Sequence, residues 1–284
     1  MAVGDLVTAD YMLEYNGVAF GGNTGIEVVS FAPFDNPDIR SSDINRPLDH
    51  GMFASQDYYG ARSVMLELEV WGGWTAVRTV LASFQTLNTE APLVFQLPTI
   101  GKLRVNARVR RRSSLPIDVT YSVGTMTSVT IELTCTDPRV YSDTLQSSVA
   151  TLGAASSGLT FNVTPNLVFG AGTSPTTTIT NGGTFETRPS IAIIGDITNF
   201  YIANDTTGLT LQFSGSSSIP LGSTLVLDFL NRTVVLNGTV SRYTWVTNSA
   251  SWWTLIPGAN SIRLGGTPGA STPTATVSWR DAYI

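Results

Sequence analysis

Apolar and polar residues alternate with a period of two over three stretches of the first half, the pattern of strands with one buried face. The stretch 64–70 has an apolar residue at every second position and two glutamates among the others, and the stretches 103–110 and 129–135 alternate similarly. After the first of them, apolar residues recur at spacings of three and four, which predicts one amphipathic helix from Trp74 to about Asn88. The first half is therefore predicted to be β-strands with one long helix.

Short apolar stretches separated by turn residues such as Asn237-Gly238 and Asn231-Arg232 fill the second half. Regularly spaced short strands are typical of a β-sandwich or jelly roll, so the chain as a whole is predicted to be mainly β. The predicted strands are Ser190–Ile194, Phe200–Asn204, Leu209–Phe213, Thr224–Phe229, Thr233–Leu236 and Thr274–Trp279.

Charge density falls near residue 140, which suggests a domain boundary. Residues 1–140 hold 11 Lys or Arg and 15 Asp or Glu, whereas residues 141–284 hold 5 and 6. A stretch rich in Ser, Ala and Thr follows the change. These features predict an N-terminal domain over residues 1–141, a linker over 142–158 and a C-terminal domain over 159–284.

One long polar segment, from Pro33 to Arg62, has scattered aromatic residues and no clear period. It is predicted to be a loop, and a loop of this length is usually functional or disordered. The segment is also long enough to reach a neighbouring subunit.

The composition narrows the classes of function. Only 13% of the residues are charged, against roughly 25% in ordinary globular proteins, which suggests a surface partly covered by partners. A net charge of -5 with one lysine, Lys102, argues against nucleic-acid binding. With Cys135 alone, no disulfide framework can form. Neither a secretory signal nor a membrane-spanning apolar run is expected, so no membrane insertion is predicted.

Side chains for catalysis or metal binding are sparse. His50 is the only histidine and is expected to be an ordinary loop residue. Glu67 and Glu69 would lie about 7 Å apart on one strand face, a spacing compatible with glycosidase carboxylates but common on exposed strands. The cluster Asp35–Asp38 lacks the ligand spacing of a calcium loop and is expected to be a turn. We therefore predict a protein that is not an enzyme and has no cofactor or metal site.

An arginine row on the polar side of the 103–110 strand offers contact chemistry. It could bind nucleic acid, but the glutamates of the 64–70 strand are more plausible partners, within one chain or between subunits. The residues expected at subunit contacts are Arg62, Glu67, Glu69, Arg104, Arg108 and Arg110. The aromatic residues Trp245, Trp252 and Trp253 are either glycan-stacking residues or core residues, and core packing is favoured.

Several of these segments together resemble the distal tail protein family of long-tailed bacteriophages. The order and spacing of the segments carry the resemblance, which extends over nearly the whole chain. In the first half they are His50-Gly51, Gly60-Ala61-Arg62, the helix from Trp74 and the stretch 137–141 with its Asp-Pro-Arg-Val-Tyr sequence. In the second half they are Pro189-Ser190, Asn237-Gly238, the stretch 252–260 and the stretch 277–283.

The resemblance implies a fold and a place in the virion. The fold is an N-terminal ring-forming β domain with one α-helix and a C-terminal galectin-like β-sandwich. Six copies would form a ring at the tail tip, assembled in the host cytoplasm. One face of the ring would dock on the tail tube protein and the other on the tail-tip hub protein, with a lumen for DNA and the tape-measure protein. The resemblance, not the periodicity, supplies the oligomer.

Two alternatives from other classes stay open at this point. A carbohydrate-binding host-attachment protein would use the tryptophans of the second domain. A glycan-degrading enzyme would need the pair Glu67 and Glu69 in a cleft.

Overall fold

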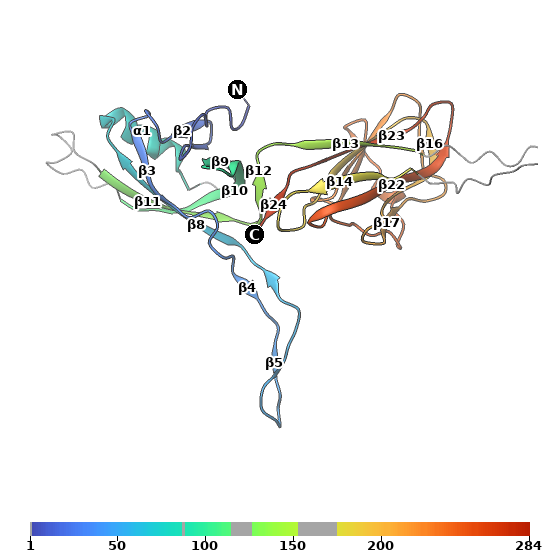
Figure 1. The fold of residues 1–284 in the computed structure, drawn as a ribbon, viewed down its shortest axis with the longest axis horizontal. Helices are drawn as coiled ribbons and strands as arrows, with labels where there is room; N and C mark the ends of the chain where they lie inside the picture. The colour runs from blue at the N-terminus through green and yellow to red at the C-terminus, as the bar shows by residue number, and fades with distance from the viewer. Residues whose placement is uncertain (1, 87–88, 115–126, 153–174) are drawn as a thin grey trace, which may run out of the picture. The chain divides into compact units, whose positions relative to one another are not determined.

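The chain is mainly β and divides into two compact units. The computed structural model describes residues 2–86, 89–114, 127–152 and 175–284. Unit 1 comprises Met1–Thr144 with the chain end Tyr283–Ile284, and unit 2 comprises Leu145–Ala282. Figure 1 shows the course of the chain.

The centre of unit 1 is a sheet in the order β2-β1-β9-β10-β11-β8-β3, with β12 pairing with β10 and β24. The pairings among β1, β2, β3, β8, β9, β10, β11 and β12 are antiparallel. Its strands are β1 (Leu13–Tyr15), β2 (Val18–Phe20), β3 (Ile26–Phe31), β8 (Arg62–Val70), β9 (Ala91–Leu97), β10 (Gly101–Arg112), β11 (Thr127–Cys135), β12 (Val140–Ser142) and β24 (Ala282–Tyr283).

The three strands predicted from alternation in the first half are present as β8, β10 and β11. Every second residue of each strand is buried, and these apolar residues form one core cluster with the helix α1 (Gly73–Ser83). The helix contributes Ala76, Val77 and Val80 to that core. One sheet face therefore packs on the core, and the opposite face, called the outer face below, carries the polar residues.

The helix is shorter than predicted. It ends at Ser83, because Phe84 leaves helical geometry and packs on Tyr15, with ring centroids 5.3 Å apart. The Asn16 side chain donates to the Ser83 carbonyl and so satisfies one of the last helix acceptors. The predicted end at Asn88 lies outside the described residues.

The segment from Pro33 to residue 61, called the arm below, is a hairpin and not a loop. Strand β4 (Ile39–Arg40) pairs with β7 (Tyr58–Tyr59), and β5 (Ile44–Asn45) pairs with β6 (Met52–Phe53). Figure 1 shows this narrow hairpin running away from β8. All eight residues of these strands are exposed, so neither face selects apolar residues and no period appears in the sequence.

Unit 2 is a β-sandwich, as predicted. A sheet in the order β13-β23-β15-β19-β20-β21 and a sheet in the order β14-β22-β16-β17, with β18 on β16, share one buried core. The first sheet contains β13 (Gln146–Thr151), β15 (Ser190–Ile194), β19 (Thr224–Asp228), β20 (Thr233–Leu236), β21 (Val240–Ser241) and β23 (Thr274–Trp279). The second contains β14 (Thr177–Asn181), β16 (Ile197–Asn204), β17 (Leu209–Gln212), β18 (Ser218–Ile219) and β22 (Gly258–Pro268), and a short 3-10 helix spans Tyr243–Trp245.

Part of the predicted linker is a strand. Residues 146–151 form β13, whose six residues all pair with β23. The short side chains of this strand hide its sheet position in the sequence, since only Ala150 of the six is fully buried. Residues 153–158 of the predicted linker lie outside the described residues.

Strand β22 is not among the strands predicted from the sequence, because Gly265 and Gly266 weaken its strand pattern. A Cβ on Gly265 would come within 2.2 Å of the Tyr201 ring, so the glycine is required by close packing across the sheet. The turn at Asn237-Gly238 is confirmed, with φ of 50° and 72° at the two residues.

Candidate assembly surfaces

Arg62 was predicted at a subunit contact, but the structure buries it in its own chain. Its exposed fraction is 0%, and its guanidinium donates to three backbone carbonyls. The acceptors are Pro138, at 2.7 Å, and the arm-root residues Pro33, at 3.1 Å, and Asp35. Burial lowers the pKa of Arg62 from its usual value. Arg62 therefore fixes the root of the arm to the sheet.

Arg104 also has a partner within its own chain. It forms an ion pair with Asp143, and its Nε lies 2.8 Å from the Asp143 carboxylate. The first part of β10 lies beside β12, and Arg104 is directly opposite Tyr141 there. Sequence reasoning missed Asp143 because it follows a separate short strand. Within the chain, Arg104 therefore pairs with Asp143 and not with Glu67 or Glu69.

The second part of β10 carries three arginines near one point of the outer face. Arg108 lies opposite Thr134 of β11, and Arg111 lies opposite Glu132, with a bulge that inserts Arg110 between them. Arg110 and Arg111 are exposed, and Arg108 is half-buried. Arg112 points differently: it donates to the Leu81 carbonyl beside the helix. Arg108, Arg110 and Arg111 form the arginine cluster.

No member of the arginine cluster forms an ion pair or hydrogen bond within the described part of the chain. The Nε of Arg108 is buried and has no hydrogen-bond partner there. Burying a charged donor without an acceptor is unfavourable by about 1–3 kcal/mol or more. The cluster therefore has unused capacity for an anionic partner.

Three glutamates lie on the outer face at β8 and β3. Glu69 is directly opposite Glu27 of β3 and Ser128 of β11, and Glu67 accepts a hydrogen bond from the Ser128 hydroxyl at 3.1 Å. Like charges directly opposite each other in a sheet are destabilising. Glu27, Glu67 and Glu69 form the glutamate cluster.

One predicted alternative is that these two clusters pair within one chain. The strand register does not place them opposite each other. Strand β11 lies between β10 and β8, which separates their backbones by about 10 Å. In register, Arg108 aligns through Thr134 with Ser63, four residues along β8 from Glu67. The side chains of the two clusters form no ion pair in the described residues.

The arm carries many large apolar side chains that are exposed. Leu48 is 99% exposed and Ile44 is 67% exposed, although both are large aliphatic residues. Further exposed apolar residues of the arm are Phe34, Ile39, Met52, Phe53, Tyr58 and Tyr59. The arm also carries five aspartates and two arginines. Such a concentration of exposed apolar surface marks an interaction site.

The tryptophans proposed for glycan contact belong to the sandwich core. Trp253 is 1% exposed, and its indole nitrogen donates to the Ile202 carbonyl at 3.2 Å, so it cannot stack on a sugar. Trp252 packs edge-on against Phe229, and Trp245 packs against Phe200. Both are partly buried against the core. The core interpretation is confirmed for Trp253.

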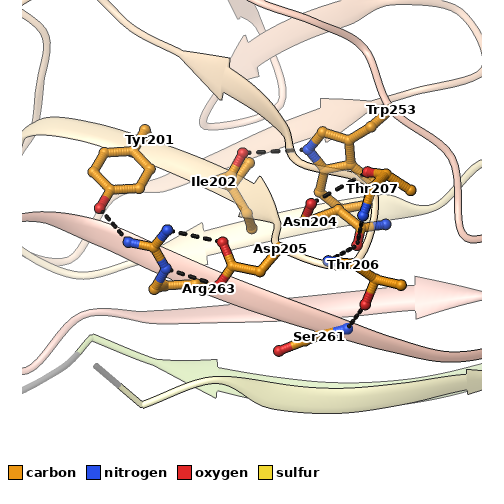
Figure 2. Close-up of polar contacts among 9 residues, drawn as sticks. All are labelled: Tyr201, Ile202, Asn204, Asp205, Thr206, Thr207, Trp253, Ser261 and Arg263. Carbon is orange, nitrogen blue, oxygen red and sulfur yellow. Dashed lines mark hydrogen bonds and ion pairs between the residues drawn. The ribbon is translucent and has the colours of Figure 1, made fainter. Parts of the chain in front are cut away.

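A polar network in unit 2 joins β16 to β22, as Figure 2 shows. Arg263 binds the Asp205 carboxylate through two nitrogens, at 2.9 and 2.8 Å, and donates to the Tyr201 hydroxyl at 2.8 Å. The hydrogen bond from Arg263 lowers the pKa of Asp205. The buried Asn204 donates to the Asn260 side chain and the Thr254 carbonyl. These groups satisfy one another, so the network fixes the sandwich.

The remaining candidate residues show no constellation for chemistry. His50 is exposed in the arm, and Glu67 and Glu69 lie on an open sheet face. In the described ranges, no group of three or more His, Cys, Asp or Glu side chains is arranged to hold a metal ion. No helix in the described part is long and apolar enough to cross a membrane.

Comparisons with known proteins relate this fold to phage tail components. Residues 182–283, within the sandwich, match the family model described as the C-terminal domain of the siphovirus-type tail component. The family match is confined to this part of the sandwich, and the similarity of the whole chain to solved structures is one of fold. No curated protein matches the chain.

Solved structures match the fold over most of its length. The Dit protein of phage SPP1, described as a paradigm of the hub adsorption apparatus in phages that infect Gram-positive bacteria, is 13% identical with a TM-score of 0.66. The match covers 96% of this chain and 99% of that one. A chain of the phage p2 baseplate, activated with calcium, is 10% identical with a TM-score of 0.48, covering 90% of this chain and 91% of that one.

Proposed function

We propose that six copies of this chain form a closed ring that joins the tail tube to the tail-tip hub and leaves a lumen for DNA and the tape-measure protein. The number of copies and the two docking partners come from the resemblance to distal tail proteins. In this role the chain is a structural virion protein assembled in the host cytoplasm, with no catalytic step.

The observation that carries the proposal is the arm. Its large apolar side chains, such as Ile44 and Leu48, remain exposed in the described structure, and Arg62 holds its root in place from the buried side. A hairpin that is fixed at its root and carries exposed apolar side chains along its length is suited to lie on another subunit, because covering each large apolar side chain contributes roughly 1.5–3 kcal/mol.

The experiment measures the mass and shape of the purified protein. We expect a ring of six copies of 30.3 kDa in mass photometry and negative-stain images. The triple variant Ile44→Ser, Leu48→Ser and Phe53→Ser should lose the ring and remain folded. The matched control, Leu221→Ser with Leu230→Ser, removes exposed apolar residues of unit 2 and should keep the ring.

A wild-type protein that stays monomeric at micromolar concentration across salt conditions would contradict the proposal. So would a ring that persists unchanged in the arm variant, because the arm would then contribute nothing to the contact.

A further inference from the structure

We infer that the outer face of unit 1 is a head-to-tail contact, in which the arginine cluster of one copy binds the glutamate cluster of the next. The inference rests on the proposed ring and names the residues at the contact between neighbouring copies. The residues are Arg108, Arg110 and Arg111 on one side and Glu27, Glu67 and Glu69 on the other.

The charges of the outer face are separated within the sheet. The arginine cluster lies on β10 and the glutamate cluster lies two and three strands away, on β8 and β3. The surface of β11 between them presents mainly hydroxyl side chains, Ser128, Thr130 and Thr134, with Glu132 as its one acidic group. The face therefore has a basic side and an acidic side.

Each side has more charge than its described neighbours balance. Arg110 and Arg111 face the single carboxylate of Glu132, and the buried Nε of Arg108 has no acceptor among the described residues. On the other side, Glu27 and Glu69 are direct cross-strand neighbours of the same charge. Both arrangements are unfavourable in an isolated subunit and are relieved when cations and carboxylates meet.

A second copy of this chain is the occupant that fits both sides. Three guanidinium groups match three carboxylates, and each copy presents both sets. In the head-to-tail contact that we infer, the arginine side of one copy meets the glutamate side of the next, and contacts of that kind generate rings when the rotation closes. Nucleic acid would satisfy the arginine cluster alone and would leave the glutamates unpaired, and the net charge of -5 opposes it.

Charge reversal tests the pairing with two residues of each cluster. Arg110→Glu with Arg111→Glu makes both sides acidic, and Glu27→Arg with Glu69→Arg makes both sides basic. We expect the ring fraction to fall at least tenfold in each variant at physiological salt. The control Arg78→Glu with Arg188→Glu changes the net charge as much as the first variant, at exposed positions outside both clusters, and should leave the ring unchanged.

Mixing the two variants distinguishes contacts between copies from effects on the fold. In a one-to-one mixture, every reversed arginine side can meet a reversed glutamate side, so rings of alternating subunits should form again. A chain carrying all four changes should also form rings by itself. Circular dichroism of each variant checks that the subunit is folded.

Rings that persist in both variants, or variants that stay folded and are not restored by mixing, would overturn the inference and leave the proposed ring standing. A wild-type protein without rings would overturn both. Binding of a labelled DNA duplex by the wild type, lost in Arg110→Glu with Arg111→Glu while rings persist, would assign the arginine cluster to nucleic acid instead.

Discussion

Replacing Arg62 by Met should loosen the arm and destabilise unit 1 without affecting unit 2. The substitution removes a buried guanidinium that donates to the carbonyls of Pro33, Asp35 and Pro138. Through these hydrogen bonds Arg62, which follows the arm, joins the start of the arm to the segment after β11. Without the donor, the three carbonyls lose their partner in the protein interior.

The magnitude follows from two opposing effects. Each buried acceptor left without a donor is unfavourable by about 1–3 kcal/mol, whereas removing a buried charge relieves a desolvation cost of several kcal/mol. Solvent at the arm root can satisfy part of the freed carbonyls. We therefore expect a net loss of roughly 3 kcal/mol, which at about 2 kcal/mol per molar urea corresponds to a midpoint shift of roughly 1–2 M.

The two units carry separate probes. Cys135 is fully buried in unit 1, so its labelling by a thiol reagent reports the opening of that unit. The buried tryptophans Trp253 and Trp279 belong to unit 2, whereas Trp71 and Trp74 of unit 1 are exposed, so fluorescence mainly reports unit 2. In urea, Arg62→Met should move the Cys135 transition and leave the fluorescence transition in place.

Two further variants sharpen the result. Arg62→Lys keeps the charge but lacks the planar fork that reaches three carbonyls, so it should also destabilise unit 1. Arg40→Met removes an exposed arginine of the arm and should behave as the wild type. An unchanged Cys135 transition in Arg62→Met, or equal shifts of both transitions, would refute the anchoring role.

Two predictions concern pH. Burial raises the pKa of the Cys135 thiol from 9.0 to about 12, so the thiol of the unfolded chain loses its proton at a lower pH than that of the folded chain. Between these two pH values, unit 1 should therefore lose up to about 1.4 kcal/mol of stability per pH unit. Urea midpoints at pH 8 and 10 should therefore differ more in the wild type than in Cys135→Ala. The pKa of Asp205 is lowered by its hydrogen bond to Arg263, so its stabilisation is present above pH 3.8 and is lost as the pH falls below it. Asp205→Asn should cost unit 2 less than about 1 kcal/mol at pH 7, since the pair is partly exposed, and the difference from the wild type should vanish in acid.

The strands with one buried face could be predicted from the sequence because burial imposes a period of two. Alternation over 64–70, 103–110 and 129–135 located β8, β10 and β11, and β15, β20 and β23 have the predicted bounds. Strands without one buried face and a regular period of two were not predicted. The arm is exposed on both faces, and β22 contains glycines that serve close packing.

The candidate contact residues were separated only by the tertiary structure. Arg62, Arg104 and Arg108 look alike in the sequence, because each is an arginine within a predicted strand or at its start. In the fold, Arg62 is buried under the arm root, Arg104 pairs with Asp143, and the buried Nε of Arg108 has no hydrogen-bond partner among the described residues. These differences depend on which strand lies beside each arginine, and local sequence does not specify the neighbouring strand.

The sequence by itself determined the mainly β composition, the division near residue 140 and the alternation that separates a buried from a polar sheet face, because these follow from local periodicity and composition. The tertiary structure decided the strand order that places β11 between β10 and β8, and with it the separation of arginines from glutamates. It also decided that residues 33–61 form an exposed hairpin held by a buried arginine, since those contacts join residues up to 76 positions apart in the chain.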